Sequence, residues 1–284
     1  MAAKKPLSLL FKITLSLGAL LYVLSRIDPG ELFGKLREIA PSFLLAALVA
    51  FNLSKIVSSI RLNRFFKAIG LALTEREALR LYYIGMFYNL FLPGGIGGDG
   101  YKIYLLNRHR EVDAKSLLAA TLLDRISGLA ALLFFAGIFF LSSRFADLFP
   151  WLVPLDYLGL VLVFPLIRLL YRGRFRRVFF STLLLGALTQ ILQLVSALFL
   201  AWSLGMEADL PELLTLFLLS SVAAVLPLSI GGVGIREFVF LYGFGLIGLP
   251  AEEGVAFSML FFLLTAFSSF LGIFLRHGLE NPRA

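Results

Sequence analysis

The sequence predicts an all-α polytopic membrane protein built from two inverted repeats, and three observations support this fold class. Of the 284 residues, 59% are hydrophobic and 15% are charged, whereas a soluble domain has about 45–50% and about 25%. Apolar runs of about 20 residues, the length of a membrane-spanning helix, recur along the chain. A proline- and glycine-rich motif occurs once in each half. A mean hydropathy of +0.90 excludes a water-soluble fold, because one core cannot bury so many apolar side chains.

Six apolar runs are interpreted as full spans. The run at 7–24 follows a basic N-terminus, but Lys12 interrupts it and no small-residue cleavage site follows. We therefore expect an uncleaved helix rather than a signal peptide. The other five predicted spans are 41–60, 116–141, 151–170, 179–204 and 254–275. Two further apolar stretches, 78–106 and 211–249, are broken by Pro and Gly and are predicted to be helical hairpins.

The two breaks share one pattern. Pro93 and Pro227 each begin the sequence P-x-x-I-G-G, at an offset of 227 − 93 = 134 residues. The predicted spans follow the same offset, which indicates a duplication. We expect one membrane domain over residues 1–284, with repeat one at about 7–142 and repeat two at about 148–276. Each repeat reads as helix, helix, broken hairpin and helix.

Basic residues are unequally divided between the predicted connections. Nineteen Lys and Arg fall on one side, in segments 1–12, 61–80, 102–115, 168–177 and 276–284, and four fall on the other. Cytoplasmic loops are enriched in Lys and Arg, so we expect the first side and both termini to face the cytoplasm, in the plasma membrane. Each half then crosses the bilayer three times, so the halves are inverted and the hairpins enter from opposite sides.

Ionisable side chains near the two breaks are candidates for a binding site. Charged residues in spans cost about 2.5–3.5 kcal/mol each on insertion scales and are commonly functional. Here opposite charges are neighbours in the sequence, and if the hairpin tips meet near mid-depth they face one polar cavity. Clustered glycines at the tips free backbone groups that suit a cavity wall. The candidate substrate-binding residues are Asp99, Lys102, Asp124, Arg125, Arg236, Glu237, Gly97, Gly98, Gly231 and Gly232.

Structural interpretations of the same residues stay open. The charges are alternatively ion pairs or helix caps, with Asp99 as an N-cap, and the glycines alternatively allow close helix packing. Asp124 and Arg125 are adjacent, so they face different ways on a helix and are expected to have different partners. The half-helix after Gly98 is expected to point free backbone N–H groups at the cavity, a setting that suits a phosphate or carboxylate.

Other polar residues in the spans receive structural interpretations. Lys55 is close to the predicted end of its span and is expected to snorkel to the surface. The run 59–82 is expected to lie along the inner surface, where Arg61 and its basic neighbours attract anionic lipid. Five uncharged polar residues either line the cavity or bridge helices, with bridging favoured for each singly: Asn52, Tyr88, Asn89, Gln190 and Gln193.

Several function classes are disfavoured by what the sequence lacks. It has no Cys and only two His, so no disulfide, thiolate metal site or metal cluster is expected. No P-loop, H-E-x-x-H or G-x-S-x-G motif occurs. The net charge of +8 is explained by loop topology rather than by nucleic-acid binding. We expect no cofactor and no catalytic residue, and therefore not an enzyme.

Three motifs occur in order along the chain: LPGGIGGDGYK at 92–102, LLDRISGL at 122–129 and LPLSIGGVGIREF at 226–238. Together they resemble the flippase-like membrane domain of lysylphosphatidylglycerol synthases, which also occurs in stand-alone proteins. The family patterns are P-G-G/S-x-G-G-D-x-x-R, D-R-x-x-G and P-x-x-x-G-G-x-G-x-x-E. The resemblance spans nearly the whole chain. One departure is Lys102 in place of the usual Arg, which keeps the charge but loses bidentate phosphate recognition.

The resemblance implies movement of a lipid, including an aminoacylated phospholipid, between leaflets. On this interpretation Lys102, Arg125 and Arg236 hold a headgroup phosphate, while Asp99 and Glu237 accept hydrogen bonds from the headgroup. Synthase activity is not expected, because the soluble catalytic domain of the two-part synthases is not in this sequence. Two alternatives remain: an intramembrane enzyme acting on a lipid phosphate, and an accessory subunit that presents lipid to a separate synthase or glycosyltransferase.

Overall fold

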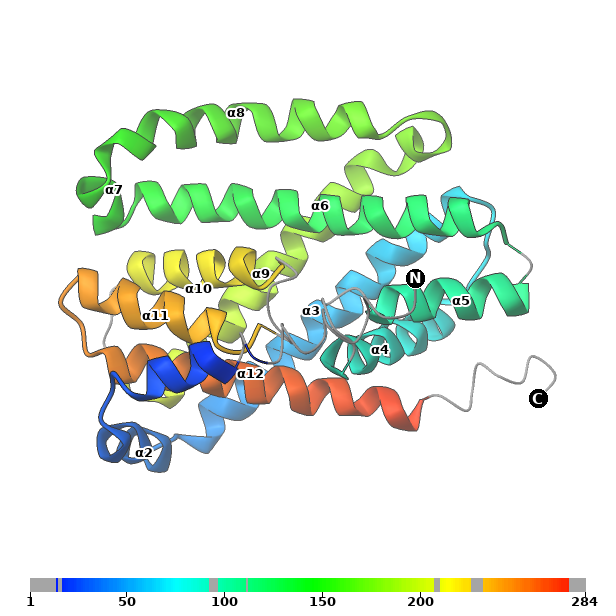
Figure 1. Cartoon of the computed structure of the whole chain (residues 1–284). Helices are drawn as coiled ribbons and strands as arrows, with labels where there is room; N and C mark the ends of the chain where they lie inside the picture. The colour runs from blue at the N-terminus through cyan, green and yellow to red at the C-terminus, as the bar shows by residue number, and fades with distance from the viewer. Residues whose placement is uncertain are drawn as a thin grey trace.

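The computed structural model describes residues 14, 17–91, 97–110, 112–206, 210–225 and 232–275, and its regular elements in these ranges are all helical (Figure 1). Residues 17–24 are helical. The helices that follow are α2 (Pro29–Arg37), α3 (Pro41–Ala68), α4 (Glu75–Phe91), α5 (Gly97–Arg110), α6 (Ala114–Leu141), α7 (Arg144–Leu148), α8 (Val153–Leu170), α9 (Phe179–Ser203), α10 (Leu210–Val225), α11 (Ile235–Leu246) and α12 (Ala251–Phe274). Short 3-10 helices lie at Pro150–Leu152 and Gly173–Val178.

Five helical segments are long and apolar enough to cross a membrane: Pro41–Ala68, Ala114–Leu141, Pro150–Leu170, Gly173–Ser203 and Ala251–Phe274. They coincide with five of the six predicted spans and confirm an all-helical, multi-pass architecture. Most of the predicted first span, 7–24, lies outside the described residues. The main difference is in α3, which continues to Ala68 instead of ending near residue 60.

Local sequence signals fix several helix ends. Asp28 caps α2 by accepting a hydrogen bond from the Gly30 backbone N–H at 2.6 Å, and Pro29 occupies the first helical position. Asp113 caps α6 by accepting from the Ser116 backbone N–H at 3.0 Å. Asp and Pro therefore start these helices at points where the backbone N–H groups have no partner within the helix.

The observed helices repeat at the offset of the two breaks. Shifting α4 by 134 residues gives 209–225, which is α10 to within one residue. The same shift places α3 on α9, α5 on the region of α11, and α6 on α12. The order and spacing of the elements are therefore consistent with the duplication predicted from the sequence.

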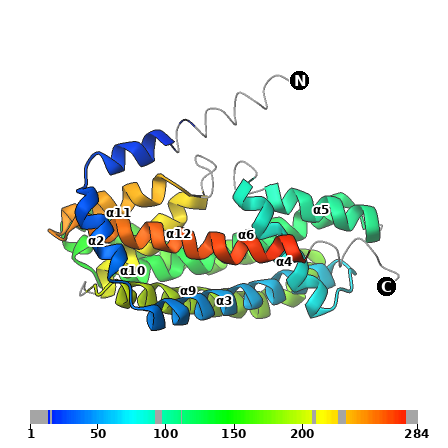
Figure 2. The same ribbon diagram turned by 90° about the horizontal axis from the view of Figure 1, so that it is seen from below.

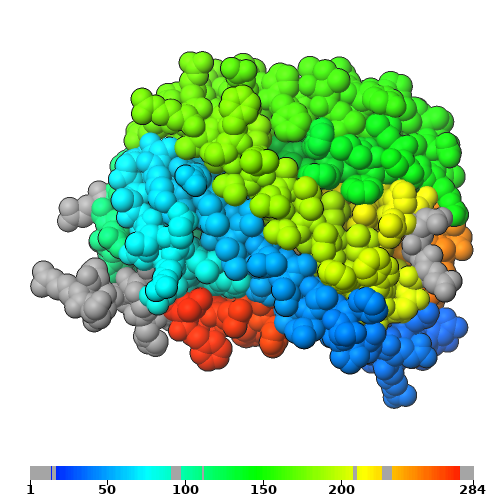
Figure 3. Space-filling view, turned by 180° about the vertical axis from the view of Figure 1, so that it is seen from behind, coloured from blue at the N-terminus to red at the C-terminus, as the bar shows by residue number. Residues whose placement is uncertain are grey.

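Helices of the first repeat pack directly against helices of the second. α3 and α9, which are equivalent, cross the molecule side by side, as the rear view in Figure 3 shows in blue and yellow-green. α4 packs on α12 of the other repeat, and α10 packs on α6. In Figures 1 and 2, α5 and α11 begin near the middle of the molecule and run towards opposite ends. This arrangement is consistent with the predicted inverted repeat.

Each hairpin consists of two neighbouring helices. The outer ends of α4 and α5 are joined by an ion pair, with Arg110 NH2 2.5 Å from Glu77 Oε1. α12 approaches α4 closely at Gly272, where an added Cβ would lie 2.2 Å from the Tyr83 carbonyl oxygen. Asn52 ties α3 to both neighbours, because it accepts from the Tyr83 hydroxyl at 2.7 Å and donates to Ser268 Oγ at 3.1 Å. The bridging role predicted for Asn52 is confirmed.

Aromatic side chains form much of the interior between the repeats. The Phe261 ring lies 5.8 Å from Phe51 and 4.9 Å from Phe217, in edge-to-face contacts. The periphery is apolar as well: Phe180 and Phe274 are 76% and 80% exposed. Exposed rings of this size have no favourable place in water, so these surfaces face lipid.

Candidate functional site: a cationic cavity between the repeats

A cavity of about 240 Å³ lies between the two hairpins. Its walls come from α3, α4 and α9–α12, so both repeats contribute. Phe51, Met86 and Phe261 form apolar parts of the wall. The polar residues that line it are Lys55, Tyr82, Asn89, Gln193, Arg236, Thr265 and Ser269. The cavity therefore combines an apolar wall with two cations.

The two cations, Lys55 and Arg236, are held against aromatic rings. Lys55 Nζ lies 4.2 Å from the centroid of the Phe51 ring, and Arg236 Cζ lies 5.3 Å from that of Phe261. Arg236 also donates to Ser221 Oγ at 3.4 Å. Within the described part of the chain, neither cation has a carboxylate within ion-pair distance. Two cations without a counter-ion in an apolar cavity favour binding of an anion.

Within the described residues, Glu237 forms no ion pair with its neighbour Arg236. One carboxylate oxygen accepts from the Gly234 backbone N–H at 2.6 Å, and the other accepts from Ser258 Oγ at 2.9 Å. Glu237 is 2% exposed, and its two hydrogen bonds join the start of α11 to α12. Adjacent residues on a helix point in different directions, which leaves Arg236 directed to the cavity.

Asp99 is the centre of a three-residue cluster beside the cavity. Its carboxylate contacts Lys102 Nζ at 2.6 Å and also pairs with Arg125 of α6. Lys102 Nζ lies 5.5 Å from the ring centroid of Tyr82, which itself lines the cavity. Asp99 thus joins α5 to α6 by pairing with two cations. It lies in the first turn of α5 rather than at its N-cap.

Asp124 pairs with Arg61 of α3, whose Nε lies 2.8 Å from Asp124 Oδ1. Both side chains are buried. The expectation that Asp124 and Arg125 have different partners is confirmed. The expectation that Arg61 lies at the inner membrane surface is wrong, because α3 continues past it and buries it against α6.

The predicted site residues are therefore only partly brought together. Arg236 lines the cavity, while the Asp99–Lys102–Arg125 cluster and the Arg61–Asp124 pair are not among the residues that line it. The expectation that all the charged pairs face this one cavity is not met by its described lining. Asn89 and Gln193 line it as polar groups, which was one of the two roles predicted for them.

The tip glycines have different structural roles. Helix α5 starts at Gly97, and the Gly98 backbone N–H donates to Asn89 Oδ1 at 2.8 Å. The Gly98 N–H therefore has a partner, and that partner is a residue of the cavity lining. Gly98 is required for packing, since an added Cβ would lie 1.9 Å from the Gly85 carbonyl oxygen. Gly232 has a positive φ of 85°, which favours glycine. Gly231 lies outside the described residues.

Lys55 is the site residue that the sequence interpretation missed. A predicted span ending near residue 60 placed Lys55 close to the membrane surface. Because α3 runs from Pro41 to Ala68, Lys55 lies at its middle. The polar residues that follow it along α3, Ser58, Ser59 and Arg61, are buried and were the available sign of a longer helix.

Within the described ranges, the polar side chains that line the cavity are suited to binding an anion. No group of three or more His, Asp or Glu in those ranges is placed to hold a metal ion. Arg236 supplies a planar donor set suited to phosphate oxygens, and Lys55 supplies a compact ammonium charge. Gln193 and Asn89 add side-chain amides that both donate and accept hydrogen bonds.

Comparison with known proteins agrees with this membrane architecture. An archaeal protein described as a UPF0104 membrane protein, from Methanothermobacter thermautotrophicus, is 24% identical over 213 residues. The match covers 74% of this chain and 54% of the relative, so the chain spans about half the length of that protein. Residues 9–272 match the family described as lysylphosphatidylglycerol synthase TM region. The chain belongs to this family of membrane regions.

Proposed function

We propose that the protein moves a phospholipid or a related lipid, including an aminoacylated one, between the leaflets of the plasma membrane. The observation that carries the proposal is the cavity between the repeats, in which Lys55 and Arg236 lack a carboxylate partner among the described residues. A lipid phosphate supplies the missing negative charge. Membership of the lysylphosphatidylglycerol synthase TM region family supports a lipid as the ligand.

In this proposal the two hairpins are re-entrant and their tips meet at mid-depth. The phosphate binds between Arg236 of the second hairpin and Lys55 of α3, while the acyl chains remain in the bilayer. Both termini face the cytoplasm. Repeats related by inversion present similar surfaces to the two sides, which permits access from either leaflet. No bond is made or broken in the lipid.

The ion-paired residues support the cavity rather than contact the phosphate. Asp99 pairs with both Lys102 and Arg125, and Asp124 pairs with Arg61. A charge in the membrane interior is costly unless it is paired. In the lining of the central cavity the positive charges without a described carboxylate partner are Lys55 and Arg236, and the lipid phosphate compensates them during passage.

The test is movement of fluorescent phospholipid between leaflets of proteoliposomes. We expect K55Q/R236Q to abolish movement and K55R/R236K, which keeps both charges, to retain it. R64Q/K115Q removes two exposed positive charges elsewhere and serves as the matched control. Movement that survives in K55Q/R236Q contradicts the cavity assignment.

The same preparation distinguishes the alternative functions. Turnover of a lipid headgroup by the purified protein, with no movement between leaflets, would indicate an intramembrane enzyme. Absence of both, together with loss of a partner's product when the gene is deleted, would indicate a subunit that presents lipid to a synthase or glycosyltransferase.

A further inference from the structure

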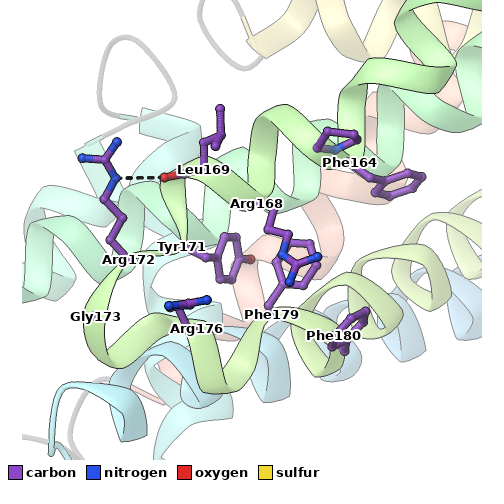
Figure 4. A pocket seen from close by; sticks show the side chains of 10 residues that line it. Phe164, Arg168, Leu169, Tyr171, Arg172, Gly173, Arg176, Phe179 and Phe180 are labelled. Atoms are coloured by element: carbon purple, nitrogen blue, oxygen red, sulfur yellow. Dashed lines mark hydrogen bonds between the residues drawn. The ribbon is translucent and has the colours of Figure 1, made fainter.

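A second, separate groove lies at the junction of α8 and α9 (Figure 4). It has a volume of about 670 Å³ and is lined by Arg168, Arg172 and Arg176, with Leu169 and Phe180 among its apolar residues. All three arginines are exposed. The function proposed above makes no use of this groove, which shares none of its lining residues with the central cavity.

The positive charge in the groove has no local counter-ion. The sequence contains no Asp or Glu between Asp156 and Glu207. None of the three arginines forms an ion pair with another described residue. Arg172 Nε donates to the Leu169 carbonyl at 3.1 Å, and Figure 4 shows its guanidinium turned away from those of Arg168 and Arg176. Arg168 and Arg176 are therefore the two available cations.

The floor of the groove is built from fixed aromatic groups. Tyr171 is 3% exposed, and its hydroxyl lies 2.8 Å from Thr182 Oγ1. Its ring packs edge-to-face on Phe179, with centroids 4.9 Å apart. These contacts join the end of α8 to the start of α9.

The walls of the groove identify the kind of ligand. Leu169 and Phe180 are 62% and 76% exposed, and α8 is the least buried of the five candidate spans. A free soluble anion gains nothing from these apolar walls. A lipid matches both the arginines and the apolar walls, because its phosphate contacts the arginines while its acyl chains lie along the walls. Basic pockets between membrane helices bind anionic headgroups in this way.

We propose that the groove formed by Arg168, Arg172 and Arg176 binds an anionic phospholipid from the bilayer. Its phosphate contacts Arg168 and Arg176, and its acyl chains lie against Leu169 and Phe180. On the orientation predicted from the sequence, this lipid belongs to the cytoplasmic leaflet. The groove is a fixed lipid-binding site that anchors the α8–α9 junction, not part of the transport cavity.

The test is native mass spectrometry of the purified full chain in detergent, titrated with phosphatidylglycerol and with phosphatidylcholine. We expect a tight phosphatidylglycerol complex that R168Q/R176Q weakens about 30-fold, on the scale known for two basic residues near an anionic surface. The matched control is R174Q/R177Q, which removes two charges from the same segment but outside the groove lining. It is expected to bind as the unaltered chain does.

Three results would overturn the proposal. R168Q/R176Q and R174Q/R177Q weaken phosphatidylglycerol binding equally, or phosphatidylcholine binds as tightly as phosphatidylglycerol, or glycerol phosphate displaces the bound lipid as effectively as phosphatidylglycerol does. The last result would identify the ligand as a soluble phosphate. R168K/R176K, which keeps both charges, is expected to retain part of the phosphatidylglycerol binding. Such partial binding would show that R168Q/R176Q loses binding through its charge and not because the protein fails to fold. R168Q/R176Q is expected to weaken phosphatidylglycerol binding to the same extent when it is combined with K55Q/R236Q, because the central cavity is a different site.

Discussion

Lys102 and Arg236 occupy equivalent positions in the two repeats, 236 − 102 = 134 residues apart, but only Lys102 pairs with a described carboxylate. Asp99, three residues before Lys102, places its Oδ1 2.6 Å from Lys102 Nζ. The residue three positions before Arg236 is Val233. A cation thus occurs at both positions and a carboxylate near only the first, and Arg236, the cation without a described carboxylate partner, lines the central cavity.

Introducing the missing carboxylate is expected to block the proposed transport. In V233D an acid stands at the sequence position equivalent to Asp99, three residues before Arg236, and is expected to pair with it, so a lipid phosphate loses one of its two proposed cationic partners. We expect strongly reduced lipid movement in proteoliposomes with a normal yield of folded protein. V233N has nearly the same shape without the charge and is expected to stay active. Equal loss in both variants would mean that shape, not charge, is responsible.

Breaking the buried ion pair between Arg61 and Asp124 is expected to destabilise the protein. D124N leaves the Arg61 guanidinium buried without a counter-ion, which costs about 3–5 kcal/mol in comparable buried pairs. The control is E75Q, which removes the Lys67–Glu75 pair, whose side chains are 42% and 48% exposed; such surface pairs contribute about 0–1 kcal/mol. Thermal unfolding in detergent measures both variants. A D124N midpoint as high as that of E75Q would contradict the assigned role.

The helices were predictable from the sequence because bilayer thickness sets their length and Pro and Gly set their ends. The ends at Leu141 and near residue 204 agree with the structure to within a residue. The end of α3 was not predictable in the same way. Arg61 and Asn63, just after residue 60, resemble a membrane boundary in the sequence, but both side chains are buried in the fold.

The site was less predictable than the fold because its charges are sorted by contacts between distant helices. Arg61 and Asp124 are 63 residues apart in the sequence, and no local pattern relates them. Arg236 and Glu237 look like an ion pair in the sequence, yet Glu237 bonds to Gly234 and Ser258. Which cation stays without a partner depends on these tertiary contacts, so sequence analysis identified Arg236 but not Lys55.

The outer ends of α4 and α5 are expected to be stabilised in a pH-dependent manner through Glu77. Burial raises the pKa of Glu77, but hydrogen bonds from Thr74 and the Arg110 guanidinium outweigh it and hold the pKa below its usual value of 4.5. A depressed pKa gives stabilisation that is present above the unfolded pKa and is lost as pH falls through the folded pKa.

The measurement is the thermal midpoint of the unaltered chain and of E77Q at a series of pH values. E77Q is expected to unfold at a lower temperature at neutral pH, and the two midpoints are expected to converge once the pH falls below the folded pKa of Glu77. A gap that stays constant down to that pH would show that Glu77 does not contribute through its charge.

The predicted orientation is testable with single cysteines because the chain has none of its own. Asn107 and Asp147 are both exposed and lie near opposite ends of the molecule, close to the end of α5 and in α7. With an impermeant thiol reagent added to intact cells, N107C is expected to stay unlabelled and D147C to react. Both are expected to react after the cells are broken. Labelling of N107C in intact cells would reverse the orientation and contradict the inverted arrangement.

Close packing inside the first hairpin is expected to depend on Gly98. In G98A the new Cβ lies 1.9 Å from the Gly85 carbonyl oxygen, so α4 and α5 must separate, whereas around Gly100 no atom lies within 4 Å of an added Cβ. Overpacking costs about 1–3 kcal/mol where side chains adjust, and backbone adjusts less easily. We expect G98A to lower the unfolding temperature and G100A to leave it unchanged or raise it, because Ala favours a helix over Gly.

Separation of α4 and α5 also displaces Asn89, whose amide oxygen accepts from the Gly98 N–H and which lines the central cavity. G98A is therefore expected to slow lipid movement as well, and unchanged stability and movement in G98A would contradict the observed approach of the two helices.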